Sequence, residues 1–131
     1  MRRRSSKQIV KVISSHVLDA LGGTDAANIE VACHRLHVDG TRVLLVQTRA
    51  DASGRIAIEV DVAADNEAVR YELAFGCADY FASQKLSSGL SRSPIGDAVF
   101  RLDLTFVADR IHVPIIIAPH GHSTWWSQAD R

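Results

Sequence analysis

NIEVACHRLHVDGTRVLLVQTRA, residues 28–50, is the stretch that decides the fold of this chain. In its first half, apolar residues stand at every second position: Ile29, Val31 and Cys33. Such alternation is typical of a half-buried strand, because successive side chains point to opposite faces. Asp39-Gly40 is a strong signal for a hairpin turn, and the β-rich run 41–50 follows it. The stretch therefore predicts two antiparallel strands joined by a tight turn.

Further strand-like runs lie on both sides of this hairpin. They are separated by turn signals and cover residues 9–18, 55–60, 69–75, 98–106 and 111–119, with a last segment at 122–128. The run 98–106 has the cleanest alternation and predicts a single strand, with one face formed by Ala98, Phe100, Leu102, Leu104 and Phe106. Pro114 cannot donate a backbone hydrogen bond, so it indicates an edge strand or a bulge. Seven to eight short strands of this kind predict an all-β sandwich.

The rest of the chain is expected to connect these strands. Residues 78–86 are the one good helix candidate, and residues 62–68 and 87–96 are expected loops. The domain is expected to span residues 9–131. Residues 1–8, which begin Met-Arg-Arg-Arg, are expected to form a flexible basic tail.

Composition limits the partners and the location that we expect. The chain has 131 residues, a length typical of one domain, and its 15 basic and 15 acidic residues give no formal net charge. This balance gives no indication of binding to nucleic acid or to an anionic membrane. No apolar run reaches the length of a signal-peptide core or of a membrane span. Cys33 and Cys77 form neither a metal motif nor a disulfide framework, so we expect buried, reduced thiols in a cytoplasmic protein.

Two histidines interrupt otherwise apolar strands. His16 lies in VISSHVL and His112 in RIHVPIII. Each one alone fits a half-buried histidine with one hydrogen bond as well as it fits a catalytic group. Arg55, which follows Gly54 at the start of a strand, would alone be a surface charge.

The other four histidines are weak candidates for metal binding. His34 and His37 would point to opposite faces of one strand and are expected to be solvated. His120 and His122 would share a face, but two ligands without a nearby acid or thiolate make a poor metal site. We expect no metal ion and no cofactor.

Four segments, taken together, carry a resemblance to a known family. They are SSHVLDALGG at 14–23, SGRIA at 53–57, YELAFGCADYF at 71–81 and IHVPIIIAPHGHST at 111–124. In order and spacing they resemble the transthyretin-like family, whose enzymes are the 5-hydroxyisourate hydrolases, and the match runs from about residue 11 to residue 124. The resemblance implies a transthyretin-like β-sandwich with one short helix. It also implies a homotetramer, a dimer of dimers, with sites in the channel where dimers meet.

The resemblance implies catalytic roles for His16, Arg55 and His112, which match the family's catalytic positions. The family reaction adds water to a carbonyl in the six-membered ring of 5-hydroxyisourate and opens that ring. A histidine titrates near neutrality and can take a proton from water. An arginine can hold a flat heterocycle and stabilise developing negative charge. A second histidine can orient the first or protonate the leaving nitrogen.

The tail departs from the family pattern. The family's hydrolases end in Tyr-Arg-Gly-Ser after Ser-Thr, whereas Trp-Trp-Ser-Gln follows Thr124 here. Trp126 takes the place of the arginine, so a broad apolar ring replaces a cation. The expected substrate contacts are Thr124, Trp126, Ser127 and Gln128. Because neighbouring strand residues point to opposite faces, Trp126 is expected to face the channel and Trp125 to pack against a neighbouring subunit or the sheet. The alternative is that both tryptophans only pack a subunit interface.

Three functions follow from these observations. The first is a hydrolase of the 5-hydroxyisourate type, which opens a ring in a small planar heterocycle during purine catabolism; His16, Arg55 and His112 support it. The second is a diverged enzyme that does acid–base chemistry on a more apolar cyclic substrate in specialised metabolism, which the tail favours. The third is a non-catalytic binding protein for a small ligand, as the transthyretins are. The retained histidines speak against it.

Overall fold

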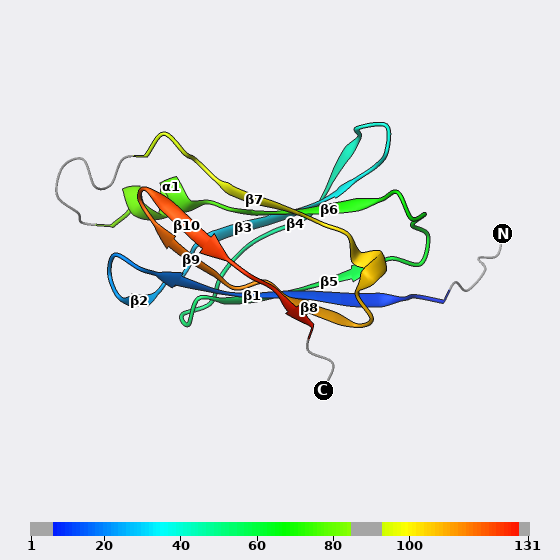
Figure 1. Ribbon diagram of the computed structural model, residues 1–131, viewed down its shortest axis with the longest axis horizontal. Coiled ribbons are helices and arrows are strands. Elements are labelled where there is room, and N and C mark those ends of the chain that lie inside the picture. The colour runs from blue at the N-terminus through cyan, green and yellow to red at the C-terminus, as the bar shows by residue number, and fades with distance from the viewer. Residues whose placement is uncertain (1–6, 85–92, 129–131) are drawn as a thin grey trace.

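Two β-sheets pack face to face in the computed structural model of this chain, which describes residues 7–84 and 93–128 (Figure 1). The first sheet is antiparallel, in the order β4 (Arg42–Arg49), β3 (Glu30–Leu36), β6 (Arg70–Phe75) and β7 (Ala98–Leu102). The second is built around β1 (Val10–Asp19). One edge of β1 pairs with β5 (Arg55–Asp61) and β2 (Thr24–Asp25). Its other edge pairs with β8 (Arg110–His112) and β9 (Ile115–Ala118), beyond which lie β10 (Gly121–Thr124) and β11 (Ser127–Gln128).

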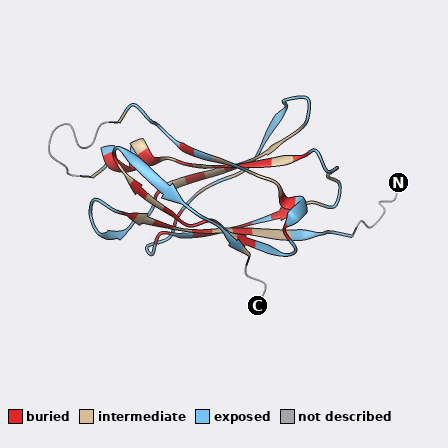
Figure 2. Cartoon of the chain, in the orientation of Figure 1, coloured by how far each residue is buried: buried red, intermediate tan, exposed pale blue. Residues whose placement is uncertain are grey.

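Alternating side chains from the two sheets meet in one hydrophobic core. β1 contributes Ile13 and Val17, and β6 contributes Tyr71 and Phe75, all at most 1% exposed. Figure 2 shows buried residues along both layers of the sandwich. Each large side chain buried in this way stabilises the fold by roughly 1.5–3 kcal/mol. The all-β sandwich that the sequence predicts is confirmed. The alternate positions on β1, Ser14 and His16 among them, point out of the sandwich.

Pro114 interrupts two neighbouring strands without shifting their register. β8 and β9 follow one another along β1, and β11 and β10 follow one another along β8 and β9. Thr124 pairs with Ile115 and Ser127 with His112, so both strands advance by three residues across the gap. The sequence indicated an edge strand or a bulge; the structure has an interior strand with a break, because proline has no N–H for the ladder. If β8 and β9 are counted as one strand, β10 and β11 as another, and the two-residue β2 is left out, the described chain has eight strands. The expected seven to eight strands are therefore confirmed.

The predicted strand 98–106 is shorter than expected. β7 ends at Leu102, and a 3-10 turn, η1 (Leu104–Phe106), follows it. The Asp103 carboxylate accepts hydrogen bonds from the backbone N–H of Thr105 at 3.0 Å and from its hydroxyl at 2.6 Å. A side chain that bonds to nearby backbone favours a turn over a strand. Phe106, expected to share one strand face with Phe100 and Leu102, therefore lies beyond the strand and is 79% exposed.

The helix α1 (Cys77–Ala82) lies in the connection between β6 and β7, two neighbouring strands of the first sheet. It starts one residue before the predicted range 78–86 and ends at Ala82; residues 85–86 of that range lie outside the described residues. The hydroxyl of Tyr80 donates to the buried Asp19 carboxylate of β1 at 2.8 Å, and Tyr80 is itself buried. Because the bond joins elements 61 residues apart, it fixes the helix against the sheet.

Three other predictions concern the surface and the cysteines. The proposed tail 1–8 and the proposed loop 87–96 fall partly on residues 1–6 and 85–92, which lie outside the described residues. Cys33 and Cys77 are buried and unbonded, as predicted, and burial raises the pKa of each thiol to about 11. No helix in the described ranges is both long enough and apolar enough to cross a membrane.

Candidate active site

The three predicted catalytic residues share one outer face of the second sheet. His16 on β1 pairs with Arg55 on β5, and Ser14 on β1 pairs with His112 on β8. Paired residues on neighbouring strands point to the same face. Ser14 and His16 are two residues apart on β1, so they also share a face. The fold thus brings together His16, Arg55 and His112, which are far apart in sequence.

Each histidine of this face has one hydrogen-bond partner. Nδ1 of His112 lies 2.9 Å from the hydroxyl of Ser14. Nε2 of His16 lies 2.9 Å from Oδ1 of Asp25. Within the described ranges, Nε2 of His112 and Nδ1 of His16 have no partner in the protein. Each ring is therefore held through one nitrogen and keeps the other for a ligand.

The surroundings of His112 favour its neutral form. Burial is the main cause that lowers the pKa of His112 below its ordinary 6.5, and the charges of Arg55, His16 and Arg110 lower it further. Both effects act in the same direction, because burial and nearby positive charge disfavour an imidazolium. At neutral pH His112 is therefore a proton acceptor, the form that a general base requires.

A tight turn positions Arg55. The Asp51 carboxylate accepts hydrogen bonds from the backbone N–H groups of Ser53 and Arg55, both at 2.9 Å. These bonds hold the pKa of Asp51 below its ordinary value. Gly54 has a φ of +73°, its carbonyl accepts from the N–H of Val17 at 2.8 Å, and a Cβ on it would lie 2.5 Å from the Val17 carbonyl oxygen. Only glycine allows this approach, which sets Arg55 beside His16.

The four predicted substrate contacts in the tail divide between two places. Ser127 pairs with His112 across β11 and β8, so it joins the outer face. The other three, Thr124, Trp126 and Gln128, line a different cleft of about 610 Å³. This cleft lies between β7 and the β8–β11 edge, and its apolar wall includes Phe100, Leu102, Phe106, Ile111 and Val113. The lining contains none of His16, Arg55 and His112.

The placement of the two tryptophans differs from the expected alternation, which would turn their side chains to opposite faces. Trp125 and Trp126 both line the cleft and are 47% and 65% exposed. They occupy the gap between β10 and β11 at the Pro114 break, where strand pairing is interrupted. Strict alternation therefore does not apply to them. The Gln128 amide, donating to the Phe106 carbonyl oxygen at 3.2 Å, ties the tail to η1.

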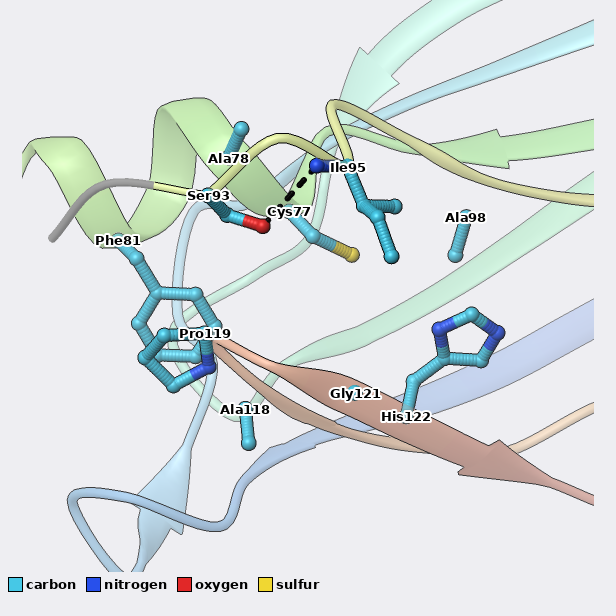
Figure 3. Close-up of a pocket in the computed structure, with 10 residues that line it drawn as sticks. All are labelled: Cys77, Ala78, Phe81, Ser93, Ile95, Ala98, Ala118, Pro119, Gly121 and His122. Carbon is cyan, nitrogen blue, oxygen red and sulfur yellow. Dashed lines mark hydrogen bonds between the residues drawn. The ribbon is translucent and has the colours of Figure 1, made fainter. Parts of the chain in front are cut away.

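The other histidines lie away from this face. The ring of His122 packs edge-on against Phe100, with centroids 5.9 Å apart. It lines a cavity of about 20 Å³ beside α1 (Figure 3), large enough for roughly one water. His34, expected to be solvated, has a buried Nδ1 with no partner among the described residues. In the part of the chain that the structure describes, no three His, Cys, Asp or Glu side chains are grouped to hold a metal ion.

Sequence reasoning missed two residues of the face, Ser14 and Asp25. Ser14 could have been found, because it lies two residues before His16 and alternation puts both on one side. Asp25 follows the Leu21-Gly22-Gly23 turn, and no spacing rule predicts that β2 turns it back onto His16.

Comparison with known proteins gives consistent matches over most of the chain. The model of the HIUase/Transthyretin family matches residues 13–126. The 5-hydroxyisourate hydrolase of Mesorhizobium japonicum is 34% identical over 115 residues, which are 86% of this chain and 89% of that protein. A solved structure of Klebsiella pneumoniae 5-hydroxyisourate hydrolase is 27% identical with a TM-score of 0.69, covering 90% of this chain and 99% of that one. A crystal structure of (S)-allantoin synthase has a TM-score of 0.72. The match covers 92% of this chain but only 45% of the synthase chain, with 24% sequence identity, so the likeness shows the fold alone.

Proposed function

Because this chain belongs to the HIUase/transthyretin family, we propose that it is a hydrolase of the 5-hydroxyisourate type. It would open a ring in a small planar heterocycle by adding water to a carbonyl. The observation that carries the proposal is the shared outer face of His16, Arg55 and His112. The relatives named 5-hydroxyisourate hydrolase, at 34% and 27% identity, support the choice of substrate.

The proposed mechanism uses each residue of this face in one role. Neutral His112 accepts a proton from a water molecule, whose oxygen attacks the ring carbonyl carbon. The carbon–nitrogen bond of the ring then breaks, and the imidazolium form of His16 gives its Nδ1 proton to the leaving nitrogen. The proton taken up by His112 then passes back to His16 and restores both residues for the next turnover. Arg55 stabilises the negative charge that develops on the carbonyl oxygen. A positioned acid or base of this kind contributes about 10²- to 10⁴-fold to the rate.

We further propose a homotetramer, a dimer of dimers. β7 ends one sheet and the β10–β11 strand ends the other, so among residues 7–84 and 93–128 both present unpaired edges. Large apolar side chains gather near these edges and are at least 47% exposed: Val99, Phe106, Trp125 and Trp126. Unpaired edges and clustered apolar side chains are typical of surfaces that another subunit covers.

The second candidate function is an enzyme that acts on a more apolar cyclic substrate, and the cleft lined by the two tryptophans favours it. The cleft volume of about 610 Å³ falls in the range of small-ligand sites, roughly 300–1,000 Å³. On this proposal Thr124, Trp126 and Gln128 contact a ligand in the cleft. Ser127 lies on the outer face, where it would contact a substrate bound beside His112. A non-catalytic ligand carrier is the third candidate. The hydrogen-bonded histidines count against it, because a carrier needs no oriented acid–base groups.

A direct assay tests the first proposal. Urate oxidase generates 5-hydroxyisourate in the cuvette, and the decay of its absorbance is followed with and without the protein. We expect acceleration by the wild-type chain and at least a 10²-fold loss in His112→Ala. Equal decay with wild-type and His112→Ala protein would contradict the proposal.

A further inference from the structure

Asp25 reaches the proposed active site from β2, one of the two shortest strands in the described part of the chain. β2 has two residues, and Asp25 on it pairs with Leu18 of β1. Its carboxylate Oδ1 lies 2.9 Å from Nε2 of His16. The His16 side chain is 21% exposed and that of Asp25 is 44% exposed. The pair therefore sits at the surface of the outer face, where a ligand can reach the ring.

The backbone around Asp25 leaves little freedom to the carboxylate. The N–H of Ala26 donates to the Val17 carbonyl oxygen at 2.9 Å, and Ala26 is fully buried. Gly54 packs against the same segment, where an added Cβ would lie 3.2 Å from the Ala26 nitrogen and 3.4 Å from the Asp25 Cβ. Three elements, β1, β2 and the turn before β5, thus converge on one carboxylate–imidazole contact.

We propose that Asp25 is a positioning residue for His16, an inference that rests on the proposed function because it takes His16 as an acid–base group. A carboxylate only accepts hydrogen bonds, so it selects the form of the ring with hydrogen on Nε2. Nδ1 then remains to exchange a proton with the substrate. The carboxylate holds the ring in one orientation and stabilises the positive charge that the ring acquires during turnover.

Two variants of the whole chain separate charge from hydrogen bonding. Asp25→Ala removes both, whereas Asp25→Asn retains an oxygen that accepts the Nε2–H but carries no charge. Asp79→Asn, an exposed carboxylate on α1, is the matched control. With hydroxyisourate, we expect kcat to fall about 10- to 100-fold in Asp25→Ala, less in Asp25→Asn and not in the control, with KM within about twofold throughout.

Nitrogen NMR of the imidazole reports on positioning without turnover. Nε2 of His16 should carry the hydrogen in the wild type, and Asp25→Ala should give a mixture of both ring forms. An unchanged ring form in Asp25→Ala would overturn the positioning role, even if kcat fell. If the wild type fails to open hydroxyisourate but shows the expected NMR change, the proposed substrate fails while the Asp25–His16 pairing stands.

Discussion

Ser14 and His112 pair across parallel strands β1 and β8, with the Ser14 hydroxyl 2.9 Å from Nδ1 of the histidine. The two residues are 98 positions apart in the chain. The contact leaves Nε2 of His112 facing away from its only hydrogen-bond partner in the described structure. Combined with a lowered pKa, it makes His112 a neutral, oriented imidazole at neutral pH, which is the form that the proposed general base requires.

The kcat/KM of the proposed reaction should stay constant to a lower pH than it would with a base of ordinary histidine pKa. The pKa of His112 lies below 6.5, so the base becomes protonated, and kcat/KM falls, only as the pH drops through that lowered value. Arg110→Gln removes one of the charges that depress this pKa. It should therefore move the acidic limb of kcat/KM to higher pH, while Arg49→Gln on the other sheet should not. If the acidic limb of kcat/KM lies at the same pH in Arg110→Gln as in the wild type, the result would argue against His112 as the base.

Replacing either histidine with alanine should remove catalysis and leave the fold intact. His16→Ala and His112→Ala should each cost about 10²-fold or more in kcat/KM. Both side chains point out of the sandwich, so their loss opens no hole in the core. Thermal unfolding followed by circular dichroism should show midpoints near that of the wild type. Variants that lose activity only because they unfold would not support an acid–base role.

Gly54→Ala should be among the most destabilising single changes. The methyl group would meet the Val17 carbonyl oxygen at 2.5 Å, at a φ of +73°. Steric overlap with backbone adds to the left-handed strain, so we expect a loss of roughly 2–4 kcal/mol in the free energy of unfolding. Gly23→Ala is the control, because its φ is +69° with nothing within 4 Å, and it should cost only about 1 kcal/mol. Urea unfolding measures both, and equal losses would show that the close approach is unimportant.

The tryptophans should act together, because both line one cleft. Light scattering with sizing at micromolar concentration should report about four wild-type chains. Trp125→Ala and Trp126→Ala should each shift the protein towards smaller species. If both variants remain tetrameric and instead lose affinity for apolar cyclic ligands, the cleft is a ligand site and the second candidate function gains support.

Hydroxyisourate turnover should be weak beside that of a family hydrolase with a tail arginine. Trp126 stands where that arginine is expected, and an indole cannot neutralise an anion. The Klebsiella pneumoniae relative, assayed in parallel, provides the reference. Trp126→Arg tests whether charge alone raises the rate. Full turnover by the wild type would show that the tail cation is dispensable.

Alternation predicted most of the strands but not all of their ends. Ile29, Val31 and Cys33 predicted β3, and the core confirms the inward face they define. The same rule failed after Leu102, because a hydrogen-bonding side chain at Asp103 turns the chain while the apolar pattern continues. The spacing of apolar residues alone does not reveal a side-chain hydrogen bond to the backbone of this kind.

The candidate site was predicted by resemblance rather than by pattern. His16 and His112 each looked like an isolated histidine, because nothing local in a sequence gives the register between strands 98 residues apart. Asp25 was missed because its contact depends on the angle of a turn. Trp125 and Trp126 line the same cleft, although alternation predicts opposite faces, because a break in pairing at Pro114 releases the tail from strict alternation.

The parallel pairing of β1 with β8 and β9 also bears on how the chain is made. β1 is synthesised about 100 residues before the strands that cover one of its edges. Until then a strand with fully buried positions such as Ile13 and Val17 has only β5 and β2 beside it. Distant pairings slow folding and leave edges open to other chains. A nascent chain stalled before Arg110 should therefore depend on chaperones to keep β1 from pairing with the wrong strand.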